Sequence, residues 1–287
     1  MLCVAAVPVS GQSSGMAGMH HDTHVVVSAK NRREIDTVTK AVAPLGNKTA
    51  AASAGFQPKF GWIPTMGEHW VSMRLMTSSG RQTNRATPSQ LMFSKINGKD
   101  SLVGAAYGYV TADNDTVRPS LFDGSPPWHE HPDLAPPGLN LVMLHVWFVP
   151  SPDGPFAGTN PNLPFWALGL AAPDAERMHD STFNSLVRRA SLALAEVADS
   201  TSILPQLKLR PEVGPAIAAR RDSVRALVPE MLAAQRAHDA ARFDRAAKKT
   251  AAQWDGMYQT YVSNARTRAG RERIEKFVAM LLGQHGE

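Results

Sequence analysis

The sequence predicts an α+β protein: a mainly antiparallel β-sheet domain with an N-terminal helix, followed by an α-helical C-terminal region. Three observations support this fold class: apolar residues at helical spacing near residues 30–45, strand-like runs between residues 67 and 170, and a helical pattern after residue 173. We therefore divide the 287 residues into a leader (1–30), an α+β domain (31–172) and a helical region (173–287).

The leader begins with a short apolar stretch followed by small and polar residues, MLCVAAVPVSGQSSG. This pattern is typical of the end of an export signal that lacks its basic start, so we expect residues 1–30 to be a disordered remnant of a signal peptide. The protein would then be periplasmic or secreted. The one cysteine, Cys3, excludes a disulfide framework and a cysteine-based zinc site.

A Met/His tail lies within the leader and contains Met16, Met19, His20, His21 and His24. Thioethers and imidazoles together suit copper. However, a flexible tail that binds stray metal weakly explains the same residues, because nothing here organises a geometry in advance.

The first helix is expected over residues 30–45, where Ile35, Val38 and Val42 recur at helical spacing and Pro44 ends the pattern. An Ala-rich stretch at 49–55 predicts another helical turn or two. A strand is then expected from Gly67. Alternation along it places His69 on an apolar face with Val71, Met73 and Leu75, and it places Glu68 on the other face. His69 is therefore the better ligand candidate of the two.

A hairpin follows, with strands at 90–96 and 101–111 joined by the turn signal Asn97-Gly98-Lys99-Asp100. Gly104, Ala106 and Gly108 share one face of its second strand. Small residues in a strand leave room for a closely packed neighbour, which is the commoner explanation, or for a cavity.

A long Pro- and Gly-rich loop at 112–140 leads into a strand at 141–149, and a further strand is expected at 165–170. Loops of this length are often functional. Both faces of the 141–149 strand are apolar, which predicts a central strand covered on each side. His145, at its centre, needs a metal, a hydrogen-bonding neighbour or a ligand, because an unpaired polar group in a dry interior is costly.

The helical region starts with a helix capped by Asp180-Ser181, and residues 211–287 predict two or three more. Possible breaks are Pro215, Pro229, Gly256 and Gly270. We expect these helices to pack on the α+β domain or to mediate association into a homo-oligomer.

The net charge of +5 is concentrated after residue 200, where 15 Lys and Arg stand against 9 Asp and Glu. A basic region can bind nucleic acid or an anionic surface. Here acidic residues are interspersed and no Lys/Arg block occurs, so a solvated helical face is the favoured interpretation and nucleic acid is not a favoured partner. No apolar run approaches the roughly 20 residues that span a bilayer.

Four histidines of the β-rich region form the candidate metal site: His69, His129, His131 and His145. His129 and His131 are two residues apart, so on extended backbone both rings point to the same side and can chelate one ion. Together the four would suit Zn²⁺ or Cu²⁺, with Fe²⁺ or Ni²⁺ as further candidates. Glu130 or Asp133 could act as a ligand, as a general base or as a partner that orients an imidazole.

Three function classes are consistent with these residues, and the first of them is favoured. The first is an extracytoplasmic transition-metal-binding protein, and the second is a metal-dependent enzyme of hydrolase or oxygenase type that uses the same histidines with Glu130 as base. The third is a non-metal protein that binds a small-molecule ligand or a partner through an aromatic pocket and its basic helices.

Three motifs, MGEH at 66–69, PSLFDG at 119–124 and LHVW at 144–147, resemble those of a poorly characterised group of secreted bacterial proteins. The resemblance covers roughly residues 31–168. It implies a small extracytoplasmic α+β domain in which His69 and His145 are the matching histidines, and it implies no established activity. This chain lacks the cysteines expected around the first motif. A cupin pattern is disfavoured, because the glutamate expected after His131 is missing.

Overall fold

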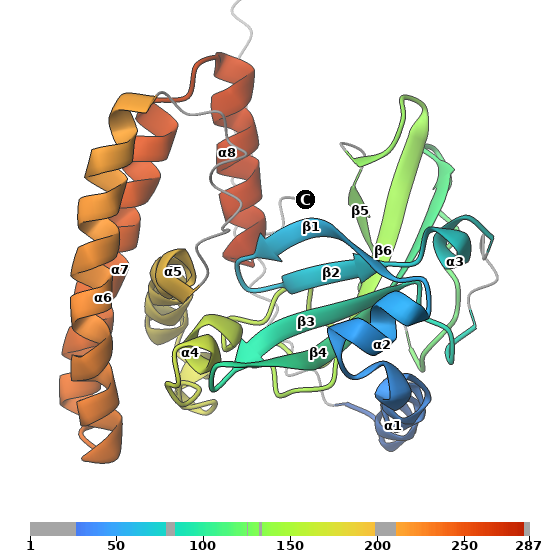
Figure 1. Cartoon of the computed structure of the whole chain (residues 1–287), viewed down its shortest axis with the longest axis horizontal. Helices are drawn as coiled ribbons and strands as arrows, with labels where there is room; N and C mark the ends of the chain where they lie inside the picture. Colours follow the sequence, from blue (N-terminus) through green and yellow to red (C-terminus); the bar gives the residue numbers. More distant parts are fainter. Residues whose placement is uncertain (1–26, 79–83, 125, 132–133, 199–210, 284–287) are drawn as a thin grey trace, which may run out of the picture.

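The computed structural model describes residues 27–78, 84–124, 126–131, 134–198 and 211–283. The Met/His tail and almost all of the leader lie outside these residues. The described chain forms an α+β fold with a six-stranded antiparallel sheet, an N-terminal helix and C-terminal helices (Figure 1). The predicted fold class is confirmed.

The sheet has the strand order β1-β2-β3-β4-β6-β5. The strands are β1 Gln57–Ile63, β2 Gly67–Val71, β3 Gln90–Ile96, β4 Lys99–Ala112, β5 His129–His131 and β6 Leu139–Trp147. The predicted hairpin is confirmed as β3 and β4, and its turn residues Asn97 and Gly98 both have positive φ, as a tight turn of this kind requires. The expected central strand is β6, which is buried on both faces between β4 and β5.

The helices are α1 Ala29–Val42, α2 Lys48–Ser53, α3 Met73–Ser78, α4 Leu163–Ala167, α5 Ser181–Ala198, α6 Gly214–Arg236, α7 Ala240–Ser263 and α8 Arg268–Leu281, with short 3₁₀ turns at Ala43–Leu45, Arg177–His179 and Pro211–Val213. The expected helices at 30–45 and 49–55 correspond to α1 and α2. The predicted cap of α5 is confirmed, because the Asp180 carboxylate accepts a hydrogen bond from the Phe183 amide at 2.9 Å.

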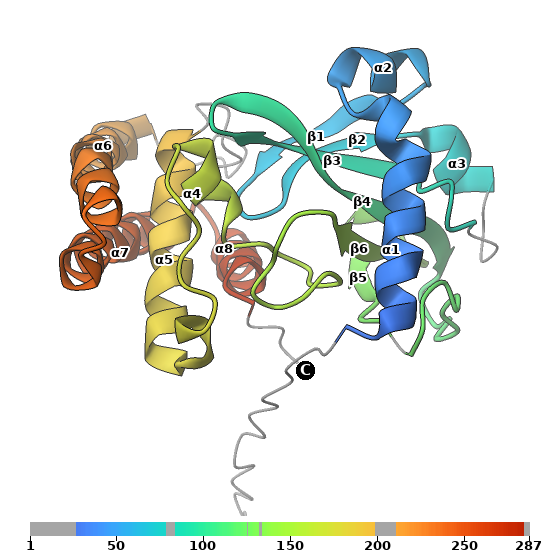
Figure 2. The ribbon, with the colours of Figure 1, turned by 90° about the horizontal axis from the view of Figure 1, so that it is seen from below.

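Two groups of helices lie on opposite sides of the molecule (Figures 1 and 2). Helix α1 covers one face of the sheet, where Val38 packs among buried residues of β4 and β6. Helices α5 to α8 form a layer with its own apolar core, which reaches the β1–β2 turn at Met66 and helix α4 at Phe165. This contact fulfils the expectation that the helical region packs on the α+β domain. Association into oligomers stays a prediction.

Several expected elements differ in the structure. Strand β1 was not predicted. The strand expected from Gly67 ends at Val71 and continues as helix α3, so Met73 and Leu75 leave the predicted strand face. The strand predicted at 165–170 is wrong, because this segment is the end of helix α4 followed by Gly169 in the left-handed conformation (φ 75°). A glycine in that conformation is a common helix stop.

The breaks expected among the C-terminal helices also differ. Pro229 lies inside α6 and Gly256 lies inside α7, while the true breaks fall near 237–239 and 264–267. A Cβ on Gly256 would lie 2.1 Å from the Arg220 guanidinium, the end of a long and partly exposed side chain that can move aside. Gly256 therefore lies in the middle of a helix and does not end it.

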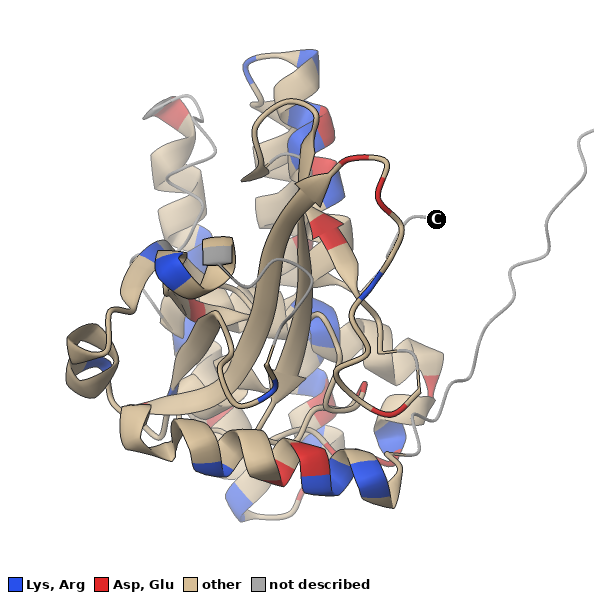
Figure 3. Ribbon diagram, turned by 90° about the vertical axis from the view of Figure 1, so that its right-hand side faces the viewer, with Lys and Arg blue, Asp and Glu red and all other residues tan. Residues whose placement is uncertain are grey.

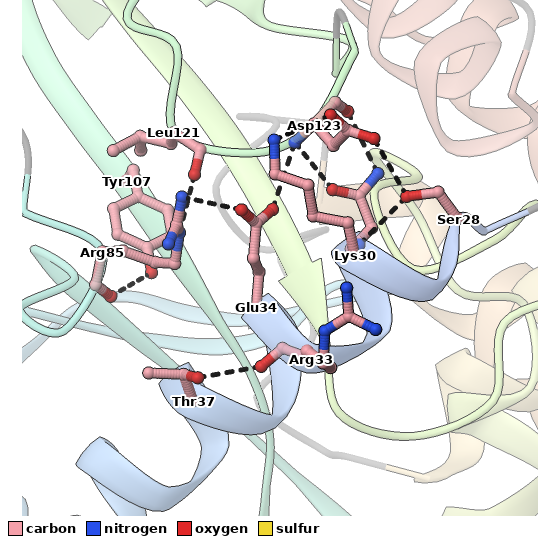
Figure 4. Close-up of polar contacts among 10 residues, drawn as sticks. Ser28, Lys30, Arg33, Glu34, Thr37, Arg85, Tyr107, Leu121 and Asp123 are labelled. Atoms are coloured by element: carbon pink, nitrogen blue, oxygen red, sulfur yellow. Dashed lines mark hydrogen bonds and ion pairs between the residues drawn. The ribbon is translucent and has the colours of Figure 1, made fainter.

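The segment that contains PSLFDG is clasped to helix α1 (Figure 4). The Asn31 side chain accepts a hydrogen bond from the Asp123 amide at 2.8 Å and donates one to the Asp123 carbonyl at 3.0 Å. Glu34 accepts a second bond from the same amide and pairs with Arg85, whose Nε donates to the Leu121 carbonyl at 2.7 Å. These contacts fix the chain shortly before β5.

Charged residues avoid the centre of the sheet. Strand β6 contains no Lys, Arg, Asp or Glu, whereas α1 carries both signs of charge on its outer side (Figure 3). No helix of the described residues combines the length and apolarity that a membrane span needs.

Candidate metal centre

The face of the sheet opposite helix α1 carries all four predicted histidines. His69 lies on β2 and pairs with Met92, and His145 lies on β6 and pairs with Ala106. On the edge strand, His129 pairs with Met143 and His131 with Leu141. Because side chains alternate along a strand, His145, Met143 and Leu141 share one face of β6, and the two edge histidines lie on the same side.

His69 and His145 meet in the interior even though β3 and β4 separate their strands. Their Nε2 atoms are 3.4 Å apart and their ring centroids 5.5 Å apart. Three strand spacings of about 4.8 Å would separate the two backbones by about 14 Å in a flat sheet. The sheet is therefore curved toward this face. The rings are almost completely buried, with exposed fractions of 1% for His69 and 0% for His145.

Small residues of β4 lie between the two histidine strands. Gly104 pairs with Met92 on one side and with Trp147 on the other. A Cβ on Gly104 would lie 2.5 Å from the Met92 methyl group and 2.7 Å from the Val146 carbonyl oxygen. The small face is therefore closely packed, which is the commoner of the two interpretations of its sequence.

The edge histidines extend the cluster. The ring of His129 lies 4.8 Å from that of His145 and 5.0 Å from that of His131, measured between centroids. The Nε2 atoms of His129 and His131 are shielded from solvent. The prediction that both rings of this pair point to the same side is met, and the structure brings all four histidines into one continuous set.

A backbone carbonyl orients His145. Its Nδ1 lies 2.8 Å from the carbonyl oxygen of Gly158, in the loop after β6. A carbonyl can only accept, so Nδ1 carries the proton, and in a neutral imidazole Nε2 then presents its lone pair toward His69. This is the arrangement that outer-shell groups impose on metal-binding histidines.

Burial keeps these rings neutral. It lowers the pKa of His69 from 6.5 to about 4, against a hydrogen bond to the Gly67 backbone that raises it, and the charge of His131 lowers it further. Burial likewise lowers the pKa of His145 well below its usual value, with additional lowering by the charges of His129 and His69. Two imidazoles at the centre of the cluster are therefore in the form that binds a metal.

Glu130 is not brought to the histidines. It lies between His129 and His131 on β5 and so points to the opposite side, where its carboxylate forms an ion pair with Arg118 and accepts a hydrogen bond from the Asn140 amide at 2.5 Å. A role as general base would need this network to open. Asp133 lies outside the described residues.

A pocket of about 250 Å³ opens on the same face, beyond the cluster. Its lining consists of Lys59, Val71, Met73, Met76, Gln90, Leu134 and Leu141. Gln90 connects it to the histidines, because its Nε2 donates a hydrogen bond to the sulfur of Met143, the residue paired with His129. Gln90 and the Gly158 carbonyl escaped sequence reasoning. In the sequence, the one indication for Gln90 was its position as a polar residue at the start of an apolar strand. The role of a backbone carbonyl cannot be recognised from the sequence, because every residue has one.

The described residues contain no group of three or more His, Cys, Asp or Glu side chains that already meets the geometry of a metal site. Comparison of the chain with protein-family models, with curated proteins and with solved structures finds no match.

Proposed function

We propose that the chain is an extracytoplasmic transition-metal-binding protein whose site is formed by His69, His129, His131 and His145. Zn²⁺ and copper are the favoured ions, with iron or nickel as further candidates, because imidazole nitrogens suit these metals. The export-like residues 1–15 support an extracytoplasmic location.

The observation that carries the proposal is the 3.4 Å between the Nε2 atoms of His69 and His145. A tetrahedral ion bound to two ring nitrogens at 2.0–2.1 Å holds those nitrogens about 3.3 Å apart. The buried pair therefore already has the separation of two ligands of one ion. Side-chain rotations of His129 and His131, whose rings lie next to His145 in the same face, would supply the third and fourth ligands.

The state of His145 strengthens this argument. The hydrogen bond to Gly158 holds the proton on Nδ1, so the lone pair of Nε2 faces the space beside His69. Burial holds the ring neutral, so no proton has to be displaced from it at neutral pH. A metal would enter a site whose central ligand is already oriented and deprotonated.

A metal-dependent enzyme is the second candidate, and the neighbouring pocket favours it. A centre with three protein ligands keeps one position open for water and hence for chemistry. The pocket lined by Gln90 and Leu141 would hold a substrate on the same face, beside the cluster. The ion pair that holds Glu130 away means that this candidate needs a base other than Glu130.

Metal analysis of the full-length, tag-free protein tests the proposal. After dialysis against chelator, titration with Zn²⁺ should show one site per chain, and binding should weaken at least tenfold in His145→Ala and in His129→Ala. The estimate follows from the loss of one ligand, since outer-shell changes alone cost 10–100-fold. His238→Asn, in the exposed loop between α6 and α7, is the control that removes an imidazole elsewhere and should leave binding unchanged.

Two results would overturn the proposal. The first is the absence of stoichiometric binding of zinc, copper, iron and nickel by the folded parent protein. The second is binding that survives in the His69→Ala/His145→Ala double variant and disappears when residues 1–26 are deleted, because the metal would then belong to the Met/His tail. Circular dichroism of each variant separates lost ligands from lost fold.

A further inference from the structure

The pocket beside the histidine cluster has the features of a separate binding site. Gln90 lines it and is 1% exposed. The side-chain oxygen of Gln90 is buried and accepts no hydrogen bond from any residue that the structure describes, although the amide nitrogen is engaged by Met143. The oxygen has almost no accessible surface, so a ligand reaches it only when the Gln90 amide turns toward the pocket. Leaving a buried acceptor unsatisfied costs about 1–3 kcal/mol, which favours this turn when a donor is present.

The other walls are apolar and adaptable. Met73 and Met76 come from helix α3, Val71 precedes it on β2, and Leu134 and Leu141 close the opposite side. Methionine thioethers make favourable contacts with aromatic rings. An apolar cavity of about 150 Å³ can hold benzene, so a pocket of about 250 Å³ holds a ring with substituents.

One positively charged side chain and several exposed apolar side chains lie at the mouth of the pocket. Lys59 is the one charged residue among the described residues that line the pocket, and its side chain is exposed. Met73 and Leu134 are 45% and 52% exposed, which is high for large apolar side chains. Leu139 and Val110, each 38% exposed, continue this surface at the adjoining ends of β6 and β4.

We infer that this pocket binds a small aromatic carboxylic acid that carries a hydroxyl group. The ring packs between the methionines of α3 and the leucines opposite, and the carboxylate pairs with Lys59 at the mouth. The hydroxyl donates to the Gln90 oxygen once the amide of Gln90 has turned toward the pocket. This ligand satisfies the buried acceptor, covers the exposed apolar surface and neutralises the charge of the lining.

The ligand site is independent of the metal proposal. Its lining contains none of the four histidines, and Gln90 together with Met143 stands between the pocket and the cluster. We therefore expect the ligand to bind the chelator-treated protein. If the protein binds no metal, the ligand should still bind. If the protein binds no ligand, the metal titration should still show one site.

Ligand-observed NMR on the full chain in the presence of EDTA tests the inference, with 4-hydroxybenzoate, benzoate and 4-methylphenol as probes. We expect saturable binding of 4-hydroxybenzoate, with weaker binding of each probe that lacks one polar group. Lys59→Ala should weaken 4-hydroxybenzoate binding about twofold to fivefold, the effect of one exposed ion pair. Lys40→Ala, on the helix that covers the opposite face, should have no effect.

Gln90→Met, a volume-conserving change, should abolish the advantage of 4-hydroxybenzoate over benzoate. If this variant does not fold, the comparison of 4-hydroxybenzoate with 4-methylphenol on Lys59→Ala still decides, because removal of the lysine should equalise the two. The inference is overturned if the parent protein binds neither acid saturably. It is equally overturned if 4-methylphenol binds the parent as tightly as 4-hydroxybenzoate does.

Discussion

The Nε2 atoms of His69 and His145 lie 3.4 Å apart although 76 residues and two intervening strands separate them. The Gly158 carbonyl fixes the proton of His145 on Nδ1, so the Nε2 of His145 faces His69 with a lone pair that can accept a proton from His69 or bind a cation. Both alternatives require neutral rings. The buried pair is therefore sensitive to acid in a way that surface histidines are not.

The stability of the metal-free protein should fall as the pH decreases from 6.5 toward 4. The unfolded chain binds a proton at His69 near pH 6.5, whereas the folded chain binds it only near pH 4, so protons favour the unfolded chain within this window. The stability is complete above pH 6.5 and is lost on acidification, by about 1.4 kcal/mol per pH unit for one such group. Urea unfolding at pH 7.5, 6 and 5 with EDTA measures the slope.

His69→Gln removes one of the titrating groups and should flatten this slope, while His238→Asn should not change it. The difference between the two variants isolates the cluster from carboxylates that also titrate at low pH. An identical slope in His69→Gln and in the parent protein would contradict the expectation.

Alternation along strands was enough to predict which histidines share a face. It separated His69 from Glu68 and placed His129 and His131 on the same side, and the structure agrees at each position. The hairpin of β3 and β4 was equally accessible, because a two-residue Asn-Gly turn leaves the pairing register little freedom.

Other features depend on contacts between distant segments and left no local pattern. The Gly158 carbonyl acts through the backbone, so the identity of the residue carries no information about it. The strand expected through Leu75 fails because helix α3 begins at Met73, and aromatic β-formers at 165–166 are overridden by packing of α4 against α5 and β3. PSLFDG, noted as a motif, is explained by the clasp at Asp123 rather than by chemistry.

Gly104→Ala should destabilise the protein and disturb the candidate metal centre. The new methyl group would lie 2.7 Å from the Val146 carbonyl oxygen, so backbone has to shift next to His145. Overpacking of this kind costs about 1–3 kcal/mol. Gly214→Ala is the matched control, because nothing lies within 4 Å of its Cβ. Equal free energies of unfolding of the two variants in urea would show that strand β4 beneath the histidines has more room at Gly104 than the contacts imply.

Asn31→Ala should loosen the clasp between α1 and the chain that leads to β5. Asn31 is 9% exposed and makes two hydrogen bonds to the backbone of Asp123. The Asp123 amide keeps its bond to Glu34, whereas the partly buried Asp123 carbonyl loses the Asn31 donor, so we expect a loss of about 1 kcal/mol. Hydrogen exchange at residues 121–124 and urea unfolding measure the effect. Lys30→Ala, which removes an exposed ion pair to the same aspartate, should change neither, and a comparable loss in that variant would mean that charge rather than backbone bonding holds the clasp.

Arg221→Met should destabilise the helical layer more than any surface charge change. Glu196 on α5 is 2% exposed, and its carboxylate accepts hydrogen bonds from Arg221 at 2.6 Å and 3.0 Å and from the Tyr261 hydroxyl at 3.4 Å. Without the guanidinium the buried carboxylate is uncompensated, which costs about 3–5 kcal/mol at neutral pH.

The charge of Glu196 determines how the stability of Arg221→Met depends on pH and how it responds to a second substitution at Glu196. Burial already raises the pKa of Glu196, and removal of Arg221 raises it further. Acidification should therefore restore part of the stability of Arg221→Met as the pH falls from the raised folded-state pKa to the unfolded-state pKa. The double variant Glu196→Leu/Arg221→Met should recover most of the loss at pH 7, because it replaces both charges by apolar groups. Arg225→Met, which breaks an exposed pair with Asp222, should be neutral. If the double variant unfolds as readily as Arg221→Met, the loss comes from packing of the arginine stem and not from an unpaired carboxylate.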